Sequence, residues 1–133
     1  MNDRELSPAG SLDVLGFYIS TTAQVYSFIH KVSIGDALEN LKDIRLTFGF
    51  GRYRSVHENT FLRDEGGVNN GFRNFTLFFE IDDPQLSVRP PHFNWEGSYE
   101  GLETKMNAEV AILQELGYTV DYKGYMPEHD VLI

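Results

Sequence analysis

The chain has 133 residues, of which 41% are hydrophobic and 14% aromatic, and its formal net charge is −9. This length suits a single domain, and the apolar content is sufficient for one hydrophobic core. The absence of cysteine excludes disulfides, thiolate catalysis and cysteine-type zinc sites. No apolar run approaches the roughly 20 residues that a membrane-spanning helix needs, so we expect no membrane partner.

The negative charge is concentrated in the second half of the sequence. Residues 1–73 carry eight basic and nine acidic side chains, whereas residues 74–133 carry three basic and eleven acidic ones. Such a field repels the phosphates of nucleic acids and attracts basic surfaces. We therefore expect no nucleic-acid partner and favour a basic protein partner, with plain solubility as the alternative role of the charge.

The N-terminal residues are polar and turn-forming. Residues 1–11, which include the run from Ser7 to Ser11, are predicted to form a flexible lead-in, and residues 12–133 to form a single domain. The lead-in lacks the basic and apolar regions of a secretory signal peptide, which predicts a cytoplasmic protein.

Two short helices are predicted in the first third of the chain. Ser20–Thr22 offer N-cap hydroxyls for a helix over residues 23–30, while residues 12–19 fit either a short strand or a helical turn. Ser33 is predicted to cap a second helix over residues 34–41, whose apolar positions recur at helical spacing.

Alternation of apolar and polar residues predicts two strands of a β-hairpin. The alternation runs over residues 44–51 and again over residues 74–81, and a Gly- and Asn-rich loop at 63–71 lies between them. Gly49 and Gly51 leave one face of the first strand bare, which predicts a bulge or a close backbone approach there.

The second half of the chain contains the clearest helix. Apolar residues recur every three or four positions over residues 99–116, with Ser98 as the predicted N-cap and Gly117 as the predicted end. Residues 86–88 are predicted as a third short strand before this helix. After the helix, the pattern predicts a strand over 118–123, a turn over 124–128 and a closing strand over 129–133.

This order of elements predicts an α+β fold. Helices that are segregated from strands in sequence usually pack as one layer on a sheet. We expect two layers, with an antiparallel β-sheet packed by the N-terminal helix pair and by the one long helix in the C-terminal half.

Two groups of acidic residues suggest an alternative function, a small metal-dependent enzyme. Carboxylate oxygens and imidazole nitrogens are common metal ligands. The first group comprises Glu128, His129 and Asp130, and the second comprises Glu80, Asp82 and Asp83. The structural interpretation of these groups is a polar turn and a protected strand end, respectively. We predict no catalytic residue, no resident metal and no cofactor.

Three arginines fall on or beside the first predicted strand. Arg45, Arg52 and Arg54, next to Tyr53, resemble the arrangement of an RNA-binding sheet. The net negative charge opposes that interpretation, so we predict that several of these arginines form ion pairs within the protein.

The segment from Pro90 to Glu100 combines the single tryptophan with acidic and aromatic residues on a proline-stiffened approach to the long helix. Trp and Tyr carry much of the binding energy at protein interfaces, and a rigid segment loses little entropy on binding. Burial of Trp95 in the core is the alternative. The exposed helix face is predicted to add acids, including Glu109. The predicted partner-binding residues are Asp82, Asp83, Trp95, Glu96, Tyr99, Glu100, Glu103, Asp121, Tyr125 and Glu128.

In its size, its charge and its aromatic–acidic segment from Phe93 to Glu128, the chain resembles the immunity proteins of bacterial polymorphic-toxin and contact-dependent inhibition systems. The resemblance implies a small cytosolic protein that neutralises a cognate toxin, often a basic nuclease, by one-to-one binding. It involves no sequence motif, so it assigns no role to any residue. We expect a monomer or weak homodimer. A nucleic-acid mimic and a dimer joined through a strand edge are further alternatives.

Overall fold

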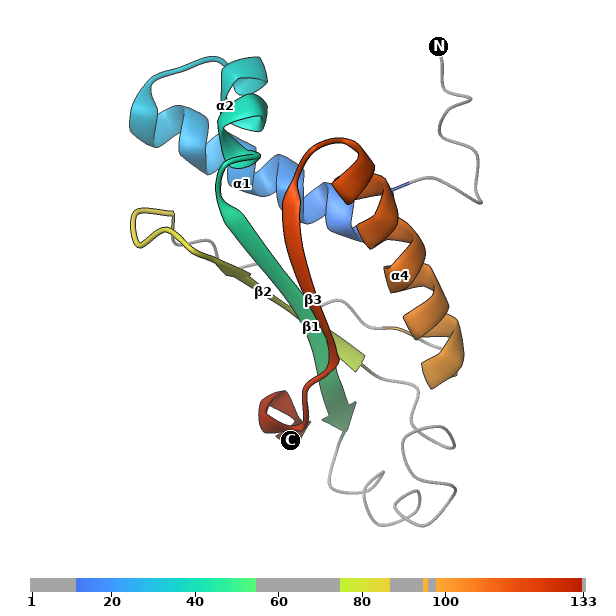
Figure 1. The fold of residues 1–133 in the computed structure, drawn as a ribbon. Coiled ribbons are helices and arrows are strands. Elements are labelled where there is room, and N and C mark those ends of the chain that lie inside the picture. Colours follow the sequence, from blue (N-terminus) through green and yellow to red (C-terminus); the bar gives the residue numbers. More distant parts are fainter. Residues whose placement is uncertain (1–11, 55–74, 87–94, 96–97, 133) are drawn as a thin grey trace.

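The computed structural model describes residues 12–54, 75–86, 95 and 98–132. Helices pack on one mixed β-sheet, which confirms the predicted α+β class (Figure 1). The predicted lead-in at 1–11 and the loop at 63–71 lie outside the described residues. The elements in chain order are α1 (Val14–His30), α2 (Ile34–Leu41), β1 (Arg45–Arg54), β2 (Phe75–Ile81), α4 (Tyr99–Glu115), β3 (Thr119–Tyr125), the 3₁₀ helix η3 (Pro127–His129) and β4 (Val131–Leu132).

The sheet has the order β2–β1–β3, and the prediction that it is wholly antiparallel is wrong. β1 pairs antiparallel with β2, as the hairpin prediction requires, but it pairs parallel with β3 and with the short β4. β2 ends beside Arg45, whose carbonyl accepts a hydrogen bond from the backbone N–H of Asp82. α4 begins near Phe50 at the other end of the sheet and leads the chain back to the Arg45 end. β3 therefore starts opposite Arg45 and runs parallel to β1.

The hydrophobic core lies between the helices and one face of the sheet. The alternation predicted this face correctly, because Leu46, Phe48 and Phe50 of β1 are fully buried. Tyr18 of α1 contacts Phe48 with a ring-centroid distance of 6.3 Å, and Tyr99 of α4 contacts Phe50 at 5.6 Å. Both helices therefore cover the same face, α1 near the start of β1 and α4 alongside β3 (Figure 1).

Helix α1 begins at Val14, so the predicted N-cap at Ser20–Thr22 is wrong. Thr22 is fully buried in the middle of the helix, and its hydroxyl donates a hydrogen bond of 2.8 Å to the Tyr18 carbonyl one turn earlier. This internal bond satisfies the hydroxyl that would otherwise favour a cap. The ambiguous residues before Ser20 are helical from Val14 onward.

The start of α1 is capped by a side chain from another helix. Asp13 occupies the N-cap position but makes no side-chain cap bond. Instead, Oε1 of Glu109 in α4 accepts hydrogen bonds from the backbone N–H groups of Val14, at 3.1 Å, and Leu15, at 2.8 Å. Lys105 lies between the carboxylates of Asp13 and Glu109. The prediction that Glu109 lies on an exposed face is therefore wrong, since this residue is 1% exposed.

The other predicted helix ends are confirmed. Ser33 and Ser98 each accept a hydrogen bond from a backbone N–H three residues later, at 3.0 and 2.9 Å. Gly117 follows the end of α4 with φ of 103°, a conformation that glycine adopts without a steric penalty. Leu86 is buried after a turn and is not in a strand, while the remaining residues of the predicted strand at 86–88 lie outside the described residues.

The second face of the sheet carries the C-terminal 3₁₀ helix. The pairing of β1 with β3 has an irregularity between Phe48 and Gly49, and after Tyr125 the chain crosses the face over the two glycines of β1. A Cβ atom on Gly51 would lie 2.8 Å from the His129 carbonyl oxygen. The predicted close approach at the glycines is thus confirmed. The predicted turn at 124–128 is shorter than expected, because β3 extends to Tyr125 and η3 follows it.

Candidate functional site

Five of the ten predicted partner-binding residues meet at the first turn of α4 and the end of β3. Tyr99 contacts Tyr125, with their ring centroids 6.3 Å apart. Trp95 precedes the helix, and Glu100 and Glu103 lie on its first turns. We call these five residues the aromatic–acidic surface.

The fold places the other predicted residues elsewhere. Asp82 and Asp83 follow β2 at the opposite end of the sheet, where Asp83 accepts a hydrogen bond from the backbone N–H of Gln85. Asp121 forms an ion pair with Lys123 on the second face of the sheet, and Glu128 lies exposed on η3. Glu96 lies outside the described residues. The ten residues therefore do not form one continuous surface.

Trp95 is held rigidly and belongs partly to the core. Its indole Nε1 donates a hydrogen bond of 2.9 Å to the Ser98 carbonyl, at the position that caps α4. The side chain is half-buried and packs against the core, and its ring lies so close to Gly101 that a Cβ atom there would be 3.3 Å away. A half-buried tryptophan fixed in this way exposes a pre-ordered aromatic edge.

Tyr99 and Tyr122 lie close to the carboxylate of Glu103, whereas Tyr125 lies close to that of Asp130. Burial, a hydrogen bond to Glu103 and the negative charge of that residue raise the pKa of Tyr99 to about 12. Burial and the charge of Glu103 raise the pKa of Tyr122 well above its usual value. Burial and a hydrogen bond to Asp130 raise the pKa of Tyr125. All three hydroxyls are therefore protonated at neutral pH and carry a proton that can be donated.

The hydroxyl of Tyr122 differs from the other two. Its oxygen is buried and has no hydrogen-bond partner among the described residues. By contrast, the Tyr125 hydroxyl donates a hydrogen bond of 2.8 Å to Oδ2 of Asp130. The buried Tyr122 hydroxyl near Glu103 therefore places a polar group beneath the aromatic rings of the aromatic–acidic surface.

Asp130, a residue of the first candidate metal group, is engaged in a structural network. Its carboxylate accepts a hydrogen bond of 2.8 Å from the Arg52 backbone N–H and forms an ion pair of 3.2 Å with the Arg52 guanidinium. Nη1 of Arg45 lies 4.0 Å from Oδ2 of Asp121. The predicted ion pairing of arginines within the protein is therefore confirmed for Arg45 and Arg52. The Arg52 guanidinium also lies 5.6 Å from the centre of the Tyr125 ring.

The two candidate metal groups do not converge. The ring of His129 stacks on Phe78 with a centroid distance of 4.1 Å, while Glu128 is exposed. Within residues 12–54, 75–86, 95 and 98–132, no three His, Asp or Glu side chains are arranged to hold a metal ion.

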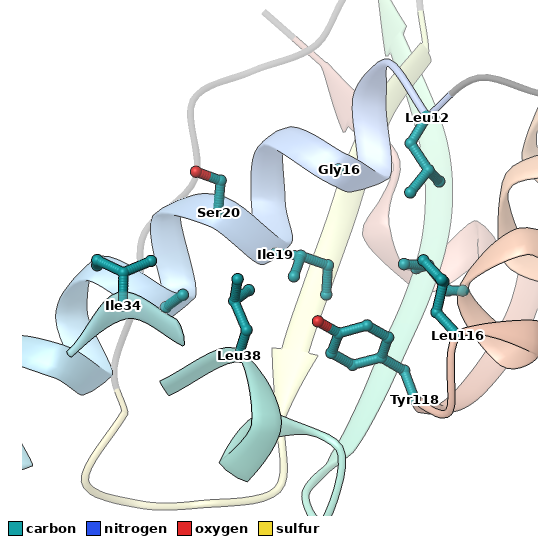
Figure 2. A pocket seen from close by; sticks show the side chains of 10 residues that line it. Leu12, Gly16, Ile19, Ser20, Ile34, Leu38, Leu116 and Tyr118 are labelled. Carbon is teal, nitrogen blue, oxygen red and sulfur yellow. The ribbon is translucent and has the colours of Figure 1, made fainter. Parts of the chain in front are cut away.

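An apolar pocket lies at the other end of α4, and no sequence pattern indicated it. It encloses about 170 Å³ between α1, α2 and the junction of α4 with β3. Figure 2 shows Ile34 and Leu38 on one side, Leu116 and Tyr118 on the other, and α1 crossing between them. The small residues Gly16, Ser20 and Ala23 leave space on this face of α1. These three small residues recur at helical spacing in the sequence. That spacing alone does not predict a pocket, because the other walls come from α2 and from the junction of α4 with β3.

Comparison with known proteins gives no relative: no protein-family model, no curated protein and no solved structure matches this chain. None of the helices in the described part of the chain is both long and apolar enough to cross a bilayer. The function must therefore be inferred from the surfaces themselves.

Proposed function

We propose that this protein is an immunity or inhibitor protein of the bacterial cytoplasm, which neutralises a basic protein, such as a toxin nuclease, by one-to-one binding. The observation that supports this function is the aromatic–acidic surface, where Trp95, Tyr99 and Tyr125 are positioned beside Glu100 and Glu103. A partner with basic residues around an apolar or aromatic centre complements such a surface.

The energetic basis of the proposal is pre-organisation. The rings of Tyr99 and Tyr125 both pack on Phe50, at 5.6 and 6.1 Å, so little side-chain freedom remains to be lost on binding. Rigid aromatic side chains of this kind act as anchors at protein interfaces, and the surrounding polar residues exclude water from them.

The charge of the surrounding surface supports attraction over a longer range. Glu100 is exposed and forms no ion pair with any described residue. The same is true of Asp82 and Glu128, which lie farther from the aromatic–acidic surface. Unpaired carboxylates steer a basic partner and accelerate association in a salt-dependent way. By contrast, Glu109 and Asp130 have their charge compensated internally.

The test begins with the purified protein as bait in an extract of the cells that produce it. We expect one basic protein to be recovered in a one-to-one complex. Its association rate, measured by surface plasmon resonance, should fall by a factor of about 10 or more between low and high salt. Recovery of no basic partner, or an association rate that salt leaves unchanged, would refute the proposed function.

Two charge reversals test the surface itself. Glu100→Lys changes an exposed residue of the aromatic–acidic surface, whereas Asp43→Lys makes the same charge change at an exposed position beside the start of β1, at the other end of the sheet. We expect Glu100→Lys to slow association about tenfold and Asp43→Lys to have a much smaller effect. Equal slowing by both variants would mean that total charge, and not this surface, controls the encounter.

A further inference from the structure

Several buried or half-buried carboxylates of this protein are compensated by a cation from the same chain. Three ion pairs of this kind are Glu109–Lys105, Asp121–Lys123 and Asp130–Arg52. Glu103 of α4 is half-buried as well, but it forms no ion pair with any residue in the described part of the chain. Its hydrogen-bond partner is the neutral hydroxyl of Tyr99, one turn earlier in the helix. The charge of Glu103 therefore has no counter-ion among the described residues.

Two tyrosine–carboxylate pairs lie next to each other at this end of the sheet. In the first pair, the Tyr125 hydroxyl donates a hydrogen bond of 2.8 Å to Oδ2 of Asp130. In the second pair, the Tyr99 hydroxyl donates a hydrogen bond to the carboxylate of Glu103. The two tyrosine rings are in contact, with their centroids 6.3 Å apart. The same combination of an aromatic ring and a carboxylate therefore occurs twice within one small area.

An arginine completes the first of these pairs. Nη2 of Arg52 lies 3.2 Å from Oδ2 of Asp130, and the centre of its guanidinium lies 5.6 Å from the centre of the Tyr125 ring. A guanidinium can make both contacts, because it is planar, stacks on aromatic faces and keeps its N–H groups free to pair with a carboxylate. The second pair offers the same two groups, but no described arginine or lysine pairs with Glu103.

The surroundings of Glu103 show a further unsatisfied polar group. The Tyr122 hydroxyl oxygen is buried and has no hydrogen-bond partner among the described residues, and it lies close enough to Glu103 for that charge to raise the pKa of Tyr122. On the neighbouring strand, Gly124 contributes no side chain beside the carboxylate, since a Cβ atom there would lie 3.6 Å from Oε2 of Glu103. Buried polar groups normally have partners. An uncompensated carboxylate near an unsatisfied hydroxyl favours a ligand that is a cation and carries several hydrogen-bond donors.

We propose that Glu103 and the ring of Tyr99 receive one arginine side chain of the basic partner, in the same way that Asp130 and Tyr125 hold Arg52. This inference rests on the proposed function, because the partner supplies the arginine. It also separates the roles of two acids on α4. Glu100 is exposed and attracts the partner from a distance, whereas Glu103 is half-buried and forms an ion pair within the complex. Lysine is a poorer fit, since its ammonium is a compact, strongly hydrated charge that does not stack.

Side-chain analogues test the chemistry in the whole protein without a partner. N-acetylargininamide and N-acetylcitrullinamide have nearly the same shape, but only the first is charged, and NMR signals of the Tyr99 ring report their binding. We expect the arginine compound to bind about fivefold more tightly than the citrulline compound or N-acetyllysinamide. Glu103→Gln should abolish this preference, and the matched control Glu100→Gln should retain it. No preference for the arginine compound in the wild type, or the same preference in Glu103→Gln, would overturn the proposal.

Thermal denaturation tests whether Glu103 lacks a counter-ion in the free protein. Asp130→Asn removes the charge of the completed pair and should lower Tm by about 4 °C. Glu103→Gln makes the same change at the pair without arginine, so its Tm should lie within about 2 °C of that of Glu100→Gln or above it. A decrease as large as that of Asp130→Asn would show that the protein itself compensates Glu103, which would contradict the proposal.

The complex with the recovered partner separates this inference from the proposed function. Glu103→Gln should increase the dissociation rate about tenfold or more and change the association rate little, because a desolvated ion pair acts mainly on dissociation. Glu100→Gln should act mainly on association. If a basic partner is recovered and Glu103→Gln leaves its dissociation rate unchanged, the arginine site is wrong while the proposed function stands. If the arginine compound binds at Glu103 and no basic partner is recovered, the proposed function is wrong and so is the assignment of the arginine to a partner.

Discussion

Replacing Glu109 by alanine removes the acceptor for two backbone N–H groups at the start of α1. In the wild type, Oε1 of Glu109 lies 3.1 Å from the Val14 nitrogen and 2.8 Å from the Leu15 nitrogen. The first N–H groups of a helix have no partner within the helix. Since Val14 and Leu15 are both buried, water does not readily replace the lost carboxylate.

The expected cost follows from these contacts. Loss of a capping side chain costs about 1 kcal/mol, and each buried donor left unsatisfied costs about 1–3 kcal/mol. The favourable interaction of a carboxylate with a helix N-terminus adds up to about 1 kcal/mol. These contributions overlap, so we expect Glu109→Ala to lower the free energy of unfolding by about 3 kcal/mol. For a domain of this size, this corresponds to a decrease in Tm of about 12 °C.

Thermal and urea denaturation followed by circular dichroism measure this change. Glu109→Gln keeps one side-chain oxygen as an acceptor but loses the ion pair with Lys105, whose Nζ lies 3.2 Å from Oε2. We expect it to lose about half as much stability as Glu109→Ala. Glu115→Ala is the matched control, because Glu115 is exposed near the end of the same helix. A Tm within about 2 °C of the control for Glu109→Ala would contradict the capping role.

Three further perturbations test other parts of the fold. Gly51→Ala should cost about 2 kcal/mol or more in urea denaturation, because the new Cβ meets the His129 carbonyl oxygen at 2.8 Å. Gly35→Ala, in an exposed part of α2 where a Cβ atom meets only Ser33 Oγ at 3.9 Å, should instead stabilise by up to about 1 kcal/mol, and destabilisation there would contradict the helix. Asp130→Ala should cost about 2 kcal/mol, since the Arg52 backbone N–H loses its acceptor, and equal stability to the wild type would refute the network. Finally, burial raises the pKa of Tyr18 from 10.0 to about 12, so the folded state holds this proton more tightly than the unfolded chain. The stability from this shift is complete below pH 10 and is lost as the pH rises toward 12. In Tyr18→Phe, the free energy of unfolding measured by urea denaturation should therefore decrease less at alkaline pH than in the wild type. The same pH profile in both proteins would argue against a raised pKa of Tyr18.

Local patterns in the sequence predicted the features that depend on neighbouring residues. Ser33 and Ser98 form the caps expected from their hydroxyls, and the alternation in β1 identified Phe48 and Phe50 as buried. These signals work because capping and strand alternation act over three residues or fewer. The class of fold followed from them directly.

Features that depend on distant residues were not predictable in this way. The start of α1 was placed too late because Glu109, which caps it, is more than ninety residues away in the sequence. The direction of β3 was wrong because alternation is the same in parallel and antiparallel strands. The predicted partner-binding set was larger than the aromatic–acidic surface, because it also included residues such as Asp82, which lie at the opposite end of the sheet.

The mixed sheet has a consequence for the order in which the chain folds. β1 meets β2 through a hairpin in which Arg52 is opposite Phe75, whereas its parallel pairing places Arg45 opposite Thr119. Contacts over short sequence separation form faster because they close smaller loops. We therefore expect the hairpin to form first and β3 to join it last. Until β3 arrives, one edge of β1 has unpaired backbone groups, so this intermediate is the species most prone to aggregation.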